Sequence, residues 1–355
     1  NESRPPETLV KISKRGQALE SHFDSAELEV QPLSNLSADF SSFPIKQWQR
    51  LQNKYWRTPY SHMLDYVSDG GYAPLRKAVA HYLRVSRGVQ VEPDQIIITT
   101  GTQQSLMLCS VVLADPFDTV WMEDPVYWGA WKVFTAAGLQ IHPIGLDEDG
   151  MSPQAQDQNF APRLIYTTPS HQYPTGTVMS LARRHQILQL AHQHQAWLLE
   201  DDYDSEYRFS GPPLSSLAGL DPNGRVLYMG TFSKVLFPGI KLGYLVVPKT
   251  LVKTFKVAHY DINRPGQLPL QAALAEFIEM GHFSAALKKA RLSYGLRRKV
   301  LLASLEPCLA HGAVMAGAEQ GLHLCIRLPS FAKDYLLAQQ LEQQGVIVRP
   351  LSSYC

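Results

Sequence analysis

The chain has 355 residues, of which 45% are hydrophobic and 18% are charged, so it can bury a large core in one large and one smaller domain. Lysine and arginine total 33 against 32 for aspartate and glutamate, and the net charge is +1. This balance, without a long run of like charges, excludes a basic nucleic-acid-binding stripe or a polybasic membrane-binding segment.

The cysteines and the hydrophobic runs exclude further classes of protein. The four cysteines form no CxxC pair, which argues against a zinc site and against a secreted disulfide framework. No apolar run reaches the roughly 18 residues of a membrane span, and the start of the chain does not resemble a signal peptide. We therefore expect a cytoplasmic protein without a membrane partner, and the first residue, Asn1, suggests that the natural chain starts further upstream.

The first elements in chain order are an arm and two helices. Residues 1–42 are polar, rich in proline and serine, and show little periodicity, which is typical of a linker or N-terminal arm. An amphipathic helix is predicted to open at Pro44, and a turn at Gly70 and Gly71 leads into a second helix.

A strand at 95–100 runs into Gly101, Thr102 and Gln103, after which a helix is predicted through Val111. Free backbone N–H groups and the helix dipole at such a helix start favour a phosphate. Many α/β turns of this kind bind nothing, so the pattern alone leaves both interpretations open.

The next strand, 119–122, ends at a turn that contains Tyr127. In open α/β sheets, ligands lie at the carboxyl ends of the strands, where Tyr127 or Trp128 could stack on a planar ring. A core position for these aromatic residues is the alternative.

Strands predicted at 163–169 and 197–200 follow, and the second ends in Asp201 and Asp202. Neighbouring residues of a strand point to opposite faces, so only one of the two carboxylates faces the ligand side. Such a carboxylate could keep a pyridinium nitrogen protonated. Helix capping or calcium-like solvation of the acidic cluster is the alternative.

The stretch 227–244 places Lys234 between a β-like run and a Pro-Gly turn, with Thr231, Ser233 and Lys241 around it. A lysine amine becomes nucleophilic near neutral pH when burial and a nearby cation lower its pKa. An amine for an imine, with hydroxyls and a second cation for an anion, is what binding of pyridoxal 5'-phosphate as a Schiff base requires. A solvated loop lysine is the alternative.

Beyond Tyr244 the pattern changes from alternating strands and helices to an α+β arrangement. We therefore predict a large domain at 43–262 and a small C-terminal domain at 263–355. The predicted elements are a helix from about 250, a break at 264–266, a long helix at 268–300 with basic residues on its outer face, antiparallel strands at 314–315 and 322–328, a helix at 331–344, and a strand at 346–349.

The motifs GTQQ, EDPVYW, SHQYPTG, EDDYDSEY and GTFSKVLFPGIKLGY occur in this order. Together they resemble the fold type I aminotransferase-like domain of MocR-type regulators in the GntR superfamily, from about residue 43 to the end. The resemblance implies an α/β fold with a mainly parallel sheet flanked by helices, and pyridoxal 5'-phosphate as the cofactor.

The resemblance also implies roles for single residues. Lys234 forms the internal aldimine, Asp201 pairs with the pyridine nitrogen, Tyr203 hydrogen-bonds the ring hydroxyl and Tyr127 stacks on the ring. The residues implied to hold the phosphate are Gly101, Thr102, Thr231 and Lys241, and Gln103 and Ser233 are further candidates for binding the cofactor. Tyr66 resembles the tyrosine that reaches the phosphate from the partner subunit, which implies a homodimer with composite sites.

Two departures from the family pattern affect the expected function. Lys241 stands where phosphate-binding members usually carry arginine, and lysine lacks the bidentate fork. Tyr173 replaces the asparagine of the aminotransferase NPTG motif, which removes one hydrogen bond to the ring hydroxyl. The chain also ends before the position of the carboxylate-binding arginine, and a winged helix that binds DNA would precede Asn1.

Three hypotheses remain. The first is the effector-sensing domain of a dimeric MocR-type regulator, which exchanges the bond at Lys234 with an amine or amino acid and shows at most slow half-transamination. The second is a working aminotransferase of the aminoadipate or aromatic class. The third is a scaffold that has lost the cofactor.

Overall fold

The structure, a computed structural model, describes residues 12–20, 33, 39, 43–57, 61–66, 68–211, 214–317 and 319–355. Most of the arm predicted at 1–42 lies outside these residues. Its described part contains an unpredicted helix, α1 (Lys14–Glu20), whose Arg15 donates a hydrogen bond to the carbonyl of Ala136 at 3.1 Å.

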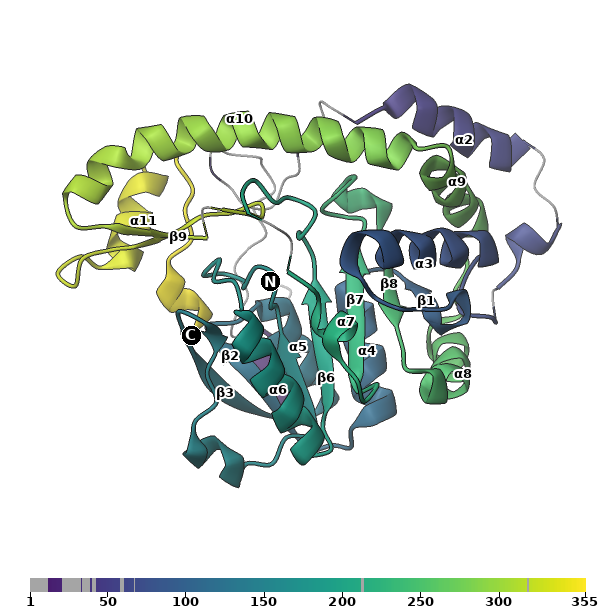
Figure 1. The fold of residues 1–355 in the computed structure, drawn as a ribbon, viewed down its shortest axis with the longest axis horizontal. Helices are drawn as coiled ribbons and strands as arrows, with labels where there is room; N and C mark the ends of the chain where they lie inside the picture. The colour runs from purple at the N-terminus through teal and green to yellow at the C-terminus, as the bar shows by residue number, and fades with distance from the viewer. Residues whose placement is uncertain are drawn as a thin grey trace, which may run out of the picture.

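An eight-stranded sheet forms the centre of the fold, in the order β1-β8-β7-β6-β5-β2-β3-β4 (Figure 1). β8 is antiparallel to β1 and β7, β4 is antiparallel to β3, and the remaining pairs are parallel. The predicted α/β class with a mainly parallel sheet is confirmed. β3, β4 and β8 have no counterpart among the predicted strands. The strands are β1 (Ile96–Thr99), β2 (Thr119–Asp124), β3 (Gln140–Asp147), β4 (Gly150–Met151), β5 (Leu164–Thr167), β6 (Trp197–Asp202), β7 (Val226–Thr231) and β8 (Gly243–Val246).

Helices cover both faces of this sheet because both faces are apolar. In β1, Ile96 and Ile98 pack on one face and Ile97 on the other, as the period of two residues per strand requires. One face packs against α4 (Thr102–Leu113), α5 (Trp128–Ala137) and α8 (Val252–Asn263). The opposite face packs against α3 (Ala73–Arg87), α6 (Leu181–Gln193) and α7 (Leu217–Leu220).

Further helices lie outside these two layers. α2 (Ile45–Arg57) contributes Trp48 to the same hydrophobic cluster as α3 and α9 (Leu268–Glu279). α10 (His282–Ala310) runs along the top of the molecule in Figure 1, and α11 (Asp334–Glu342) lies below one end of it. Short 3-10 helices complete the described chain: η2 (Ser61–Leu64), η3 (Pro93–Gln95), η4 (Ala155–Asn159), η5 (Pro238–Ile240), η6 (Lys249–Leu251) and η7 (Leu351–Tyr354).

Two predictions for the C-terminal part are wrong. The single helix expected at 268–300 is divided into α9 and α10, because Gly281 adopts φ 76°, a left-handed conformation that interrupts the helix. The strand expected at 346–349 is absent from the described chain, because this segment finds no neighbouring strand and leads into η7. The expected antiparallel pair is confirmed, as β9 (Val314–Ala316) with β10 (Cys325–Arg327).

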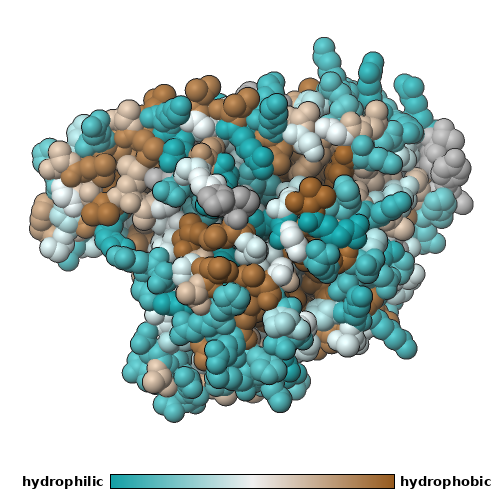
Figure 2. Space-filling model, viewed as in Figure 1, coloured by the Kyte–Doolittle hydropathy of each residue, from teal (hydrophilic) through white to brown (hydrophobic). Residues whose placement is uncertain are grey.

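The surface is mostly polar, with hydrophobic residues gathered below α10 on the face that Figure 2 shows. The exposed side of α10 carries the predicted basic residues but also the large apolar side chains of Leu292, Leu296 and Val300. Among the described helices, none is long and apolar enough to cross a bilayer.

Candidate functional site

A cavity of about 350 Å³ opens at the carboxyl edge of the sheet. The parallel strands end there, and antiparallel β8 begins there, since Gly243 pairs with both Thr99 and Thr231. The volume of this cavity falls within the roughly 300–1,000 Å³ of small-molecule binding sites. The lining residues are Thr100, Gly101, Thr102, Gln103, Gln104, Tyr127, Tyr166, Thr168, Tyr173, Asp201, Tyr203, Thr231, Ser233, Lys234, Lys241, Tyr294, Leu322 and His323.

The start of α4 forms one end of this cavity. Gly101 joins β1 to α4 with φ 123°, a backbone conformation that a side chain would strain. The first-turn N–H groups of a helix have no intrahelical acceptor, and here Thr102, Gln103 and Gln104 border the cavity. This end of the cavity is therefore suited to an anion. Lys241, exposed in a left-handed turn at φ 46°, adds a positive charge.

Lys234 follows β7 on the same side of the sheet. Burial lowers the pKa of its amine, whereas the nearby carboxylates of Asp204 and Asp201 raise it, and the net direction is downward. A lower pKa increases the fraction of neutral, nucleophilic amine. The turn is fixed by a hydrogen bond from the Ser233 N–H to Thr231 Oγ1 at 3.1 Å and by one from Tyr207 Oη to the Lys234 carbonyl at 3.2 Å.

Asp201 is the carboxylate that faces this cavity. Its Oδ2 accepts a hydrogen bond from Tyr166 Oη at 3.0 Å, and its Oδ1 accepts one from Thr102 Oγ1 at 3.3 Å. Burial raises the pKa of Asp201 to about 7, helped by the nearby Asp202 and Asp204 and opposed by these hydrogen bonds. A buried carboxylate of this kind is well prepared to accept a positively charged N–H group.

Asp202 points to the opposite face, as strand alternation requires. It forms an ion pair with Arg87 at 2.7 Å and accepts a hydrogen bond from Tyr228 Oη. The side chains of Arg87 and Asp202 are 8% and 1% exposed, so this is a buried structural pair and not part of the cavity.

Tyr127 forms a side wall of the cavity. Its ring meets that of Tyr173 edge to face, with centroids 5.9 Å apart and an interplanar angle of 89°. The ring lies directly over Gly129, where any Cβ would collide with it. Burial raises the pKa of Tyr127 to about 12, helped by the charge of Asp201, so the hydroxyl remains protonated.

Tyr203 lines the cavity near the end of β6 and contacts His171. Tyr203 Oη donates a hydrogen bond to the His171 carbonyl at 2.8 Å and retains acceptor capacity. His171 Nδ1 lies 3.0 Å from Asp204 Oδ2, which also accepts the Leu322 N–H at 2.9 Å.

His323 completes this wall from the C-terminal region, with its ring centroid 4.3 Å from that of His171. Burial and, to a smaller extent, the nearby His171 lower the pKa of His323 to about 3, so the His323 imidazole is neutral. Within the described chain, His171, Asp204 and His323 are a group whose donor atoms, all within 4.8 Å, could hold a metal ion. Because His171 Nδ1 and Asp204 Oδ2 already bond each other, we interpret the group as a hydrogen-bonded wall.

The structure brings the predicted site residues together, with one exception. Ten of them line the same cavity: Gly101, Thr102, Gln103, Tyr127, Asp201, Tyr203, Thr231, Ser233, Lys234 and Lys241. Tyr66 is 60% exposed and does not line it, so its role across a subunit interface stays a prediction.

The sequence reasoning missed several lining residues. Tyr166 lies inside a predicted strand, and its hydroxyl is directed at Asp201. Tyr294 comes from α10, and His323 lies in a segment predicted as strand, although β10 begins only at Cys325. The position of Tyr166 one residue before the end of β5 was a usable signal; Tyr294 and His323 had none.

The donor set fits pyridoxal 5'-phosphate. The cavity combines an amine of lowered pKa, a buried carboxylate and a helix start that binds anions, contributed by β7, β6 and α4. The amine matches the aldehyde of the cofactor, the carboxylate matches a ring nitrogen that takes up a proton, and the helix start matches the phosphate.

Comparisons with known proteins agree with this geometry. The family model for aminotransferase class I and II matches residues 41–355. The probable rhizopine catabolism regulatory protein MocR of Rhizobium meliloti is 39% identical over 314 residues, which cover 88% of this chain and 64% of that protein. The HTH-type transcriptional regulator YhdI of Bacillus subtilis is 36% identical over 89% of this chain and 67% of its own length.

Solved structures of enzymes are also similar. Kynurenine aminotransferase of Pyrococcus horikoshii superposes with a TM-score of 0.84 at 26% identity, covering 98% of this chain and 87% of that one. The aminoadipate aminotransferase LysN of Thermus thermophilus gives a TM-score of 0.80 at 26% identity, covering 96% of this chain and 86% of that one.

Fold and site therefore define a fold type I protein of the class that uses pyridoxal 5'-phosphate. The chain belongs to the aminotransferase class I and II family, and its regulator relatives place it among the MocR-type members of the GntR superfamily. It spans 64% of the length of the Rhizobium meliloti regulator.

Proposed function

We propose that this chain is the effector-sensing part of a MocR-type transcription regulator and that it holds pyridoxal 5'-phosphate through Lys234. The observation that carries the proposal is the pairing of Lys234 with Asp201 in one cavity, in a chain more similar to regulators than to the aminotransferase relative at 27% identity. Tyr173 in place of the NPTG asparagine supports a sensor over an enzyme.

Each protein group has a defined task in this proposal. The bound cofactor supplies an aldehyde that condenses with amines and a ring that withdraws electrons. The Lys234 amine forms the covalent link, and Asp201 accepts the ring N–H. The α4 start, Thr231, Ser233 and Lys241 hold the phosphate, while Tyr127 packs on the ring and Tyr203 faces its hydroxyl.

The effector is an amine or amino acid that takes the place of Lys234 on the cofactor. Tyr173, Tyr294 and His323 line the remaining part of the cavity, where they would contact the effector's side chain. A regulator needs a difference in affinity between two conformations, and turnover of the effector adds nothing to that difference.

The functional unit in this proposal is a homodimer. Tyr66 is well exposed in the single chain, as expected of a side chain that enters a partner's cavity. DNA would be bound by a winged-helix domain outside residues 1–355, in keeping with the HTH-type names of the relatives. The proposed domain division remains 43–262 and 263–355.

A second candidate function is that of a working aminotransferase, favoured by the similarity to kynurenine aminotransferase at a TM-score of 0.84. The two candidates differ in turnover. Absorption spectra of the holoprotein mixed with single amino acids should show exchange at Lys234 with slow or absent conversion to the amine form of the cofactor. Steady multiple turnover with an amino acid and a keto acid, measured on a full-length chain, would reject the sensor in favour of the enzyme.

A further inference from the structure

A second cavity, of about 480 Å³, lies on the other side of the loops that form the cofactor site. No described residue lines both cavities. The second cavity is bordered by the end of α3, by α6, by the 205–211 loop, by α10 and by Gln320. It is therefore a separate site and not an extension of the first.

The wall between the cavities is built from adjacent residues that face opposite ways. Ser170 lines the second cavity, while its neighbour His171 belongs to the wall of the first. Arg208 forms an isolated antiparallel bridge with Gln320, whose side-chain amide donates to the Ser170 carbonyl. Gln320 lines the second cavity, and Leu322, two residues further along the chain, lines the first.

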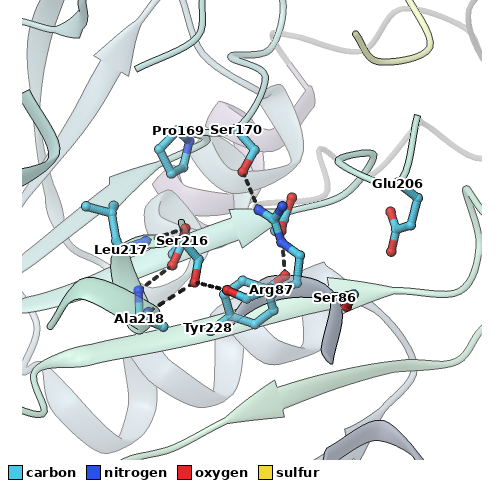
Figure 3. Close-up of polar contacts among 12 residues, drawn as sticks. Ser86, Arg87, Pro169, Ser170, Glu206, Ser216, Leu217, Ala218 and Tyr228 are labelled. Atoms are coloured by element: carbon cyan, nitrogen blue, oxygen red, sulfur yellow. Dashed lines mark hydrogen bonds and ion pairs between the residues drawn. The ribbon is translucent and has the colours of Figure 1, made fainter. Parts of the chain in front are cut away.

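The lining of the second cavity is strongly basic. It contains Arg87, Arg184, Arg208 and Arg291, and its carboxylate is that of Glu206. Figure 3 shows the Arg87 guanidinium beside Ser170, with Glu206 standing apart from it.

Only part of this positive charge is neutralised. Arg87 pairs with Asp202 at 2.7 Å, and Arg184 lies 3.9 Å from Glu200. No described carboxylate lies within 4.0 Å of the guanidinium groups of Arg208 or Arg291. Their hydrogen bonds go to neutral oxygens of Gly211, Gln320 and Glu206, the last through its backbone carbonyl.

Glu206 offsets little of the remaining charge. Its carboxylate accepts a hydrogen bond from Tyr82 Oη at 2.9 Å. Burial and, to a smaller extent, the negative charge of Asp202 raise the pKa of Glu206 to about 7. A large fraction of the Glu206 carboxyl groups is therefore protonated near neutral pH.

Several donors at this cavity have no acceptor among the residues that the structure describes. Arg87 Nε and Arg184 Nη1 are buried without a hydrogen-bond partner. Leaving a buried donor unsatisfied is unfavourable, and an acceptor on a bound ligand would relieve it. Arg208 Nη2 and the two Nη atoms of Arg291 also lack a described acceptor. Guanidinium groups favour oxyanions such as phosphate and carboxylate, which they bind in bidentate geometry.

We propose that this second cavity binds a small dianion, a phosphate ester or a dicarboxylate, through Arg208 and Arg291. The buried donors of Arg87 and Arg184 lie at its base and supply further positive potential. Two guanidinium groups without carboxylate partners match two negative charges, and the volume admits a small organic molecule. The site would give the chain a second ligand, independent of the one bound at Lys234.

The test uses inorganic phosphate and succinate as probes, titrated calorimetrically at constant ionic strength. Arg208→Gln/Arg291→Gln should weaken binding of at least one probe tenfold or more. Arg50→Gln removes an exposed arginine of α2 and should not change the affinity by more than about twofold. Binding of phosphate alone assigns a phosphate site, and binding of succinate alone assigns a dicarboxylate site.

Two outcomes would overturn the proposal: no saturable binding of either probe, or binding lost in Lys241→Gln but kept in the double variant. The second outcome would place the anion at the cofactor site. Arg291→Gln alone is the safeguard if the double variant fails to fold, because Arg291 is exposed on α10 and its one hydrogen bond goes to the Glu206 carbonyl. It should still weaken the affinity severalfold.

Discussion

Asp201 and Asp202 are neighbours in β6, yet their carboxylates have opposite tasks. Asp201 lies in the cofactor cavity with Tyr166 Oη at 3.0 Å, whereas Asp202 lies behind the sheet and pairs with Arg87 at 2.7 Å. The same substitution at the two positions should therefore change different properties of the protein.

Asp201→Asn should weaken pyridoxal 5'-phosphate by at least tenfold, which corresponds to about 1.4 kcal/mol. An amide has nearly the same shape, but it carries no negative charge to keep the ring nitrogen protonated. Absorption titration of the apoprotein with the cofactor measures the effect. A larger loss of affinity in Asp202→Asn than in Asp201→Asn would show that the two carboxylates have been assigned to the wrong faces.

Asp202→Asn should instead destabilise the fold. It leaves the Arg87 guanidinium, 8% exposed, without its counter-charge. Breaking a buried ion pair from one side costs about 3–5 kcal/mol. Urea unfolding of the apoprotein gives the free energy directly, with Asp115→Asn as a control at an exposed aspartate outside both cavities. A loss below about 1 kcal/mol would mean that Arg87 is adequately solvated without Asp202.

The stability of the apoprotein should depend on pH through Asp201. An unfolded aspartate has a pKa near 3.9, and burial raises the pKa of folded Asp201 to about 7. The folded chain thus keeps a proton that the unfolded chain releases. The stability from this group is complete below about pH 4 and is lost as the pH rises to about 7, by at most about 1.4 kcal/mol per pH unit.

Asp201→Asn removes this titration. The unfolding free energy of the variant minus that of the unchanged apoprotein should rise between about pH 4 and 7 and then become constant. Urea unfolding across this range measures it. A difference that does not vary with pH would show that the pKa of Asp201 is not raised.

Lys234→Ala should abolish covalent attachment of the cofactor. Borohydride reduction followed by mass spectrometry of the intact chain should detect the added cofactor mass in the unchanged protein and in Lys241→Ala, but not in Lys234→Ala. The Lys241 variant is the matched control, because that lysine lines the same cavity and remains exposed. An adduct that persists in Lys234→Ala would reject the assignment.

Gly129→Ala tests whether the ring of Tyr127 needs the space above α5. Alanine in a helix is ordinarily favoured over glycine by about 1 kcal/mol, but a Cβ here would collide with the Tyr127 ring. We expect the ring to move and cofactor affinity to fall severalfold, while the fold persists. In Gly145→Ala the new Cβ meets open space, so affinity should not change. Equal affinities in the two variants would show that Tyr127 does not contact the ring.

The local sequence determined the elements of the cofactor site. The apolar run at 95–100 and the glycine at 101 predict a strand followed by a helix start. The rule that parallel strands present ligands at their carboxyl ends brings Asp201 near Lys234. These features depend on residues close together in the chain, so composition and spacing are sufficient to reveal them.

The tertiary structure decided what local patterns do not contain. Tyr294 reaches the cavity from α10, and His323 reaches it from a loop beside His171, because packing over long sequence distances places them there. The second cavity is likewise lined by residues from distant parts of the chain, namely Arg87 of α3, Arg208 of the 205–211 loop and Arg291 of α10. Each of these arginines reads as an ordinary surface charge in the sequence, because local periodicity carries no information on which distant elements meet. Their shared cavity arises only when the sheet, α10 and the loops pack together.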